Sequence, residues 1–185
     1  WSAIVAALGA TFSRATAATS WGEGGDMEVA GPDVPRFDYR FNSGVAEGIL
    51  LEGARTNAIR NSIFRGVTPG VIGAGGAWPT NWQNGGASGL TRTISAPYQY
   101  RGMTCIDVRY HGITTDAGGY PLIFEPPSAI AASSGQSWTM STYLALVGGS
   151  MANISSFRFY IPPQPSGVAA ASNSIGPELT SELKR

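Results

Sequence analysis

The residues in this sequence that could do chemistry are one histidine, one cysteine, a set of acids and a set of aromatic rings. His111 is the only histidine, so a Ser-His-Asp triad could form only around residue 111, and no nucleophile there stands in an elbow motif. A metal site built from several histidines is excluded as well. Cys105 is the only cysteine, which excludes an internal disulfide, and its apolar neighbours favour a buried strand position over a reactive thiol.

Paired carboxylates are the remaining route to catalysis, because glycoside hydrolases place two acids across a cleft. The chain has 12 acidic residues, so chance pairs are expected, and Asp107, Asp116 and Glu125 stand in no diagnostic context. Asp26, Asp33 and Asp116 lie near glycine or proline, where oxygen ligands suit calcium, but their spacing is not that of an EF-hand loop. We therefore predict a non-enzymatic protein without metal or other cofactor, and structural calcium is the alternative.

Aromatic rings in turn-rich or outward-facing positions are the residues best suited to binding. Sugar-binding proteins stack rings on sugars and hold the hydroxyls with amides and carboxylates. Trp78 and Trp82 lie in a loop rich in glycine and proline, and packing at the end of the core is the competing interpretation for both. The glycan-binding candidates are Trp78, Trp82, Tyr143, Tyr160, Asp107 and Arg109. Further ring candidates are Tyr98, Tyr100, Tyr110, His111 and Tyr120.

Alternating side chains after residue 103 predict the strands that would position these residues. In segment 104–110, apolar residues alternate with Asp107 and Arg109, which is typical of a half-buried strand. The pattern recurs in segments 120–124, 135–147 and 155–161. Segment 135–147 is the clearest, and its phase places Trp138 in the core. Short strands, turn-rich links and no amphipathic helix predict an all-β chain, most simply a jelly-roll-like antiparallel β-sandwich.

The composition limits the partners that this chain can have. Of its 185 residues, 43% are apolar, enough for a core, and 13% are charged. Twelve basic residues balance twelve acidic ones without a charge run, so we expect no binding of nucleic acid or anionic lipid. The apolar opening segment 1–10 is too short to span a membrane and lacks the basic flank of a signal peptide, so we expect no membrane insertion.

The chain is predicted to have two parts. Residues 1–60 form an extended leader or docking arm, in which glycines predict a hairpin over 21–29. Residues 61–185 form the β-sandwich module. Jelly rolls need about eight strands, and the sequence suggests fewer good ones. We therefore expect an incomplete sandwich that continues beyond Arg185.

Two arginines of the leader are candidates for docking. Arg36 and Arg55 can each make forked hydrogen bonds to a carboxylate or to carbonyl oxygens. Asp38 and Glu52 are nearby partners in the sequence. We predict that these four residues fix the leader against a neighbouring subunit. An ordinary solvated surface is the alternative, because most exposed ion pairs contribute little stability.

Two groups of segments resemble a known class of proteins. Segments 11–19 (TFSRATAAT), 34–39 (VPRFDY) and 48–57 (GILLEGARTN) resemble the recurring leader of phage and prophage tail-fibre-like proteins. Segments 78–82, 88–92, 106–109 and 134–143 resemble the first half of the jelly-roll module, similar to carbohydrate-binding modules, that follows this leader. The resemblance extends over roughly residues 11 to 160, and the ordered combination of these segments is more specific than any single one.

The resemblance implies a structural or attachment protein of a virion, such as a tail fibre, tail-tip protein or head spike. Its expected partners are other virion subunits, further copies of itself, most simply in a trimer, and host-surface polysaccharide. A connector or decoration protein without a ligand is the second reading. A polysaccharide depolymerase ranks last, because a parallel β-helix would show a repeat of about twenty residues, and none is visible.

Overall fold

The computed structural model describes residues 7, 9, 11–53, 56–85, 89–116, 122–124, 130–131, 133, 135–154, 157–160, 172–175 and 179–182, the side chains of 157–160 and 172–175 excepted. The chain is all-β and contains several antiparallel sheets, which confirms the predicted fold class. It divides into two units, Trp1–Ile130 and Ala131–Arg185. Within the described ranges, no helix is long and apolar enough to cross a membrane.

The first unit begins with two hairpins. Strands β1 (Ala18–Trp21) and β2 (Met27–Ala30) form the first, and β3 (Phe37–Tyr39) and β4 (Ala46–Ile49) form the second. The first hairpin confirms the one predicted over 21–29, and Gly25 supplies a positive φ of 77° in its turn. Trp21 is buried, and its ring lies 4.6 Å from that of Phe41. This contact joins the two hairpins through an aromatic pair.

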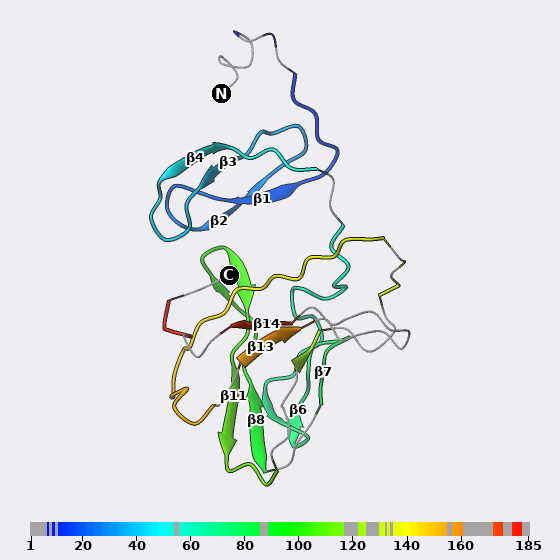
Figure 1. The fold of residues 1–185 in the computed structure, drawn as a ribbon, viewed down its shortest axis with the longest axis vertical. Helices are drawn as coiled ribbons and strands as arrows, with labels where there is room; N and C mark the ends of the chain where they lie inside the picture. The colour runs from blue at the N-terminus through cyan, green and yellow to red at the C-terminus, as the bar shows by residue number, and fades with distance from the viewer. Residues whose placement is uncertain are drawn as a thin grey trace. The chain divides into compact units, whose positions relative to one another are not determined.

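The largest sheet has the strand order β11-β8-β5-β6. Its strands are β5 (Gly70–Ile72), β6 (Gly75–Gly76), β8 (Leu90–Ile94) and β11 (Val108–Gly112). Figure 1 shows β8 and β11 side by side, and they pair antiparallel with Val108 opposite Ile94. Ile94 is 1% exposed and is a central core residue of this sheet. Gly76 is required here, because a Cβ atom on it would lie 2.5 Å from the backbone of Gly70.

Two smaller two-stranded sheets complete the described part of the first unit, and the first of them is a hairpin. Strands β9 (Tyr98–Tyr100) and β10 (Met103–Cys105) pair antiparallel, and β7 (Gln83–Asn84) pairs with β12 (Leu122–Ile123). In the second unit, β13 (Phe157–Tyr160) pairs with β14 (Ser172–Ile175). Strand β13 confirms the strand predicted over 155–161, and β12 falls within the one predicted over 120–124.

Two strand predictions need correction. The strand predicted over 104–110 is broken at Ile106 and Asp107, because the chain leaves the β9–β10 hairpin there and joins β8 as β11. The strand predicted over 135–147 is not formed: Gly135 lies in a turn, and 136–147 contain only a single bridge at Leu144. Trp138, expected in the core, is 44% exposed. No described strand pairs with this segment, so its alternating pattern has no sheet against which to bury one face.

Candidate functional site

The β9–β10 hairpin carries two neighbouring aromatic rings on one face. Tyr98 and Tyr100 are two residues apart in β9, so their side chains point to the same side of the strand. They are 39% and 42% exposed. Their cross-strand partners are Cys105 and Met103. We call Tyr98 and Tyr100 the tyrosine pair; exposed rings of this kind suit stacking on the C–H face of a sugar.

Asp107 completes this surface as a hydrogen-bond acceptor. The Tyr98 hydroxyl donates to Oδ1 of Asp107 at 2.7 Å. The Asp107 backbone N–H donates to Oγ of Ser95 at 2.9 Å, and the Ser95 N–H donates to the Asp107 carbonyl at 3.0 Å. These bonds fix the carboxylate beside the hairpin. Its Oδ2 accepts no hydrogen bond from a described residue, so this oxygen can accept one from a ligand hydroxyl.

The protonation of Tyr98 follows from this contact. Partial burial of the phenol, the hydrogen bond to Asp107 and the charge of that carboxylate raise the pKa of Tyr98 to about 12. Tyr98 is therefore a neutral donor over the whole physiological range. The hydroxyl directs its proton to Asp107, and its oxygen lone pairs are available as acceptors.

The turn between β9 and β10 positions a guanidinium next to the tyrosine pair. Arg101 and Gly102 form a two-residue turn with φ values of 50° and 71°. The Arg101 Cζ lies 5.7 Å from the Tyr100 ring centroid and 5.6 Å from that of Phe41. Its Nη1 donates to Oδ1 of Asn42. The cation is therefore flanked by two aromatic rings and held by one neutral acceptor.

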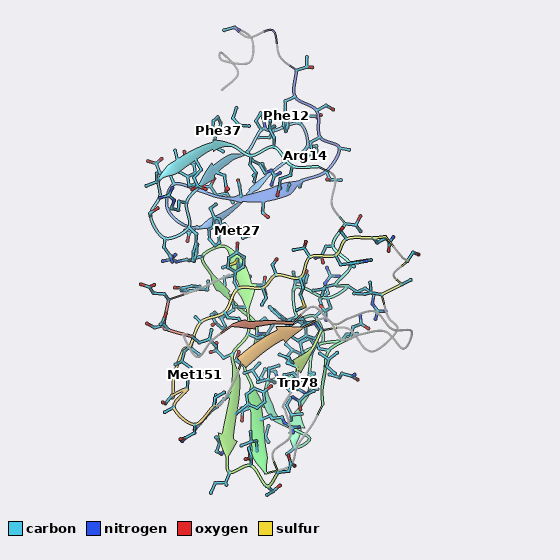
Figure 2. The ribbon with its side chains drawn as sticks, in the orientation of Figure 1. Phe12, Arg14, Met27, Phe37, Trp78 and Met151 are labelled. Atoms are coloured by element: carbon cyan, nitrogen blue, oxygen red, sulfur yellow. The ribbon has the colours of Figure 1, made fainter. Side chains whose placement is uncertain are left out.

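Close backbone contact anchors the same turn to the first hairpin. The Met27 N–H donates to the Arg101 carbonyl at 2.8 Å, and Figure 2 shows Met27 beside this turn. A Cβ atom on Gly102 would lie 2.3 Å from the Met27 carbonyl oxygen, so only glycine permits this approach. The position of Arg101 is thus determined by the backbone as well as by its side chain.

Trp82 and Trp78 are placed differently from the tyrosine pair. The Trp82 ring lies 5.0 Å from Phe64 and 4.7 Å from Phe124, and its Nε1 donates to the Asn61 carbonyl at 3.1 Å. Both its ring and its polar atom are used within the chain, which favours the packing interpretation. Trp78 is half-buried and precedes Pro79, one of the most deeply buried residues.

The other predicted glycan-binding residues are scattered. Arg109 is exposed on β11 opposite Thr93, and its side chain makes no hydrogen bond or ion pair with a described residue. Tyr143 is half-buried in the second unit. Tyr160 lies in β13, and its side chain falls outside the described part of the chain. Of the six candidates, only Asp107 is shown in contact with the tyrosine pair.

Three of the four predicted docking residues lie around β1. Arg36 is 9% exposed; its Nη1 donates to the Thr19 carbonyl at 2.6 Å and its Nη2 to Oε2 of Glu52 at 3.0 Å. Asp38 Oδ1 accepts a hydrogen bond from the Trp21 N–H at 3.2 Å. These groups therefore connect the two hairpins within one chain. Arg55 lies outside the described residues.

Arg36 also borders a cavity of about 270 Å³. Its other walls come from β1, β2, β3 and the link before β3, and include Glu28, Val34 and Phe37. The Arg36 Nε is buried and has no partner among the described atoms. This arrangement is a cleft between hairpins with Arg36 among its lining residues.

Sequence reasoning missed Arg101, and it named Tyr98 and Tyr100 only among the further ring candidates, not as a pair. The available pattern was a pair of short alternating segments, 98–100 and 103–105, separated by two residues of which the second is glycine. Such spacing is typical of a β-hairpin.

Within the described residues, no group of three or more His, Cys, Asp or Glu side chains could hold a metal ion. Comparison with protein-family models, curated proteins and solved structures finds no match to this chain.

Proposed function

We propose that this chain is a non-enzymatic attachment module of a phage or phage-like particle, and that it binds host-surface glycan through the β9–β10 hairpin. The observation that carries the binding proposal is the tyrosine pair, exposed on one strand face beside the fixed carboxylate of Asp107. Rings supply the stacking surface, and the free Asp107 oxygen accepts from a sugar hydroxyl. The attachment role rests on the resemblance of segments 11–19, 34–39 and 48–57 to tail-fibre leaders.

Binding through two rings and one carboxylate is weak at each site. Repetition of the site in an oligomer, most simply a trimer, raises the apparent affinity without any new contact. The low charge content of 13% agrees with a partner recognised by stacking and hydrogen bonding. Each copy then contributes one hairpin to a multivalent surface on the particle.

The test is binding of the native oligomer to an array of bacterial envelope polysaccharides. We expect wild-type protein to bind at least one polysaccharide, and a Tyr98→Ala/Tyr100→Ala variant to lose most of that binding. Trp138→Ala is the control, because Trp138 is a similarly exposed ring, at 44%, outside the hairpin. Equal binding by the double variant, or no binding by wild-type protein, would contradict the proposal.

A structural connector without a ligand is the second candidate, and exposed apolar side chains favour it. Val29 in β2 is 71% exposed, Ile49 in β4 is 43% exposed and Leu51 is 77% exposed. Apolar residues at such exposure suit contact with another subunit. Under this alternative, Val29→Ser/Leu51→Ser changes the mass of the native assembly, whereas the tyrosine variant has no effect on any binding measurement.

A further inference from the structure

The turn of the β9–β10 hairpin has an unusual residue in a strained conformation. Two-residue hairpin turns with positive φ at both positions favour asparagine or aspartate followed by glycine. This turn has Arg101 at the first position with φ of 50° and Gly102 at the second. An arginine is an uncommon residue there, because its Cβ atom is crowded in the left-handed region. A strained residue in a hairpin that already carries the candidate site suggests a role for its side chain.

The charge of Arg101 is not neutralised within the described structure. Ion pairs seen between described residues include Arg36 with Glu52 and Arg40 with Glu47. Arg101 has no described carboxylate within 4.0 Å, and its one side-chain hydrogen bond goes to the neutral amide of Asn42. Four of its five N–H donors thus have no described acceptor.

The rings beside Arg101 determine what kind of anion would suit it. The guanidinium lies over Tyr100, whose neighbour on the same strand face is Tyr98. A planar guanidinium binds a carboxylate through two parallel hydrogen bonds, and an adjacent tyrosine stacks on a sugar ring. One monosaccharide that carries both a C–H face and a carboxylate fits this combination.

We propose that the hairpin is specific for a carboxylated sugar, such as a uronic acid residue, and that Arg101 is the residue that selects it. The proposal rests on the glycan-binding function proposed above and specifies its ligand class. Arg101 forms the fork to the sugar carboxylate, the tyrosine pair stacks on the ring, and Asp107 accepts from a hydroxyl on the side remote from the carboxylate. Placing the carboxylate toward Arg101 keeps the two like charges apart.

The discriminating variant is Arg101→Asn. Asparagine is favoured at positive φ in this turn type, so this change removes the guanidinium while it preserves or improves the turn. Arg101→Lys keeps the charge but loses the fork. Arg65→Gln removes a positive charge from an exposed side chain outside the hairpin and serves as the control.

Binding is measured with the native assembly against alginate, polygalacturonate and hyaluronan, each before and after chemical reduction of its carboxylates, with dextran as a neutral reference. We expect binding of at least one polyuronate and a loss of about tenfold or more after reduction, because charge-assisted hydrogen bonds are lost. Arg101→Asn should show the same loss at unchanged thermal stability, and Arg101→Lys an intermediate one. Arg65→Gln should bind like wild type.

Four results would overturn the inference. Equal binding before and after reduction, or binding of dextran alone, removes the carboxylate preference but leaves the glycan-binding function in place. Wild-type affinity of Arg101→Asn removes the assigned role of Arg101. Absence of binding to all of these polysaccharides also rejects the inference, and the envelope array then decides separately whether the hairpin binds any glycan.

Discussion

The hydroxyl of Tyr98 donates a hydrogen bond to Asp107 Oδ1 at 2.7 Å, and this contact couples the β9–β10 hairpin to the start of β11. It links a residue of the β9–β10 sheet to the residue just before β11, a strand of a different sheet, because β9 pairs with β10 while β11 pairs with β8. The same bond orients a ring and a carboxylate that we assign to ligand binding. The effect of this hydrogen bond on the titration of Tyr98 and on stability can be measured without knowledge of the ligand.

Replacement of Asp107 should change the titration of Tyr98. In Asp107→Asn the carboxylate charge is lost, so the pKa of Tyr98 falls from about 12. It stays above 10.0, because burial, the largest cause of the shift, is unchanged. Tyrosinate absorbance as a function of pH, with Tyr98→Phe to assign the transition, measures this shift. Asp26→Asn, which alters an exposed acid in the β1–β2 turn, should leave the titration unaltered.

The stability of the protein should decrease at alkaline pH through the same group. Between pH 10 and about 12, folded Tyr98 retains a proton that unfolded Tyr98 has lost. The folded state then binds more protons, so the free energy of unfolding decreases as pH rises through this window. The contribution of protonated Tyr98 to the free energy of unfolding is fully present below pH 10 and is lost as the pH rises to about 12. Denaturant unfolding at several pH values measures the slope, and Tyr98→Phe should make it shallower; an identical slope in that variant would contradict the assignment.

Asn61 should be important for stability because its side chain is buried and both of its polar atoms form hydrogen bonds. It is 4% exposed; its Nδ2 donates to the carbonyls of Arg65 and Thr80, and its Oδ1 accepts from the Arg65 N–H. Asn61→Ala leaves these backbone groups without their partner and should reduce the free energy of unfolding by about 2 kcal/mol. Denaturant unfolding measures the loss. Asn153→Ala, at an exposed position, is the control.

Two isoleucines provide a matched test of the core. Ile94 in β8 is 1% exposed, whereas Ile113, just after β11, is 85% exposed. Ile94→Ala should reduce the free energy of unfolding by about 3 kcal/mol, through lost burial and the cavity that remains. Ile113→Ala should change it by less than about 0.5 kcal/mol, as surface substitutions do. Similar losses in the two variants would place the core elsewhere.

The candidate site was only partly accessible to sequence reasoning. Aromatic and acidic residue types pointed to sugar binding, and Asp107 was among the chosen candidates. Tyr98 and Tyr100 were named as ring candidates, and their pairing on one hairpin could have been found from the two-residue spacing between 98–100 and 103–105. The aromatic environment of Arg101 could not, because Phe41 is distant in the sequence and meets it only through the fold. The same holds for Trp82, whose neighbours Phe64 and Phe124 come from separate segments.

What the sequence by itself determined was the class of structure and its local elements. Alternating side chains and frequent turn residues specify an all-β chain, the hairpin near residues 21–29 and the strand within 155–161. Alternation and turn formation are properties of residues close together in the sequence, so they can be recognised without the fold. Only the tertiary structure decided which strands find partners. Segment 136–147 alternates well and yet forms no strand, since hydrogen bonds to a distant edge, and not the pattern of its own side chains, make a strand part of a sheet.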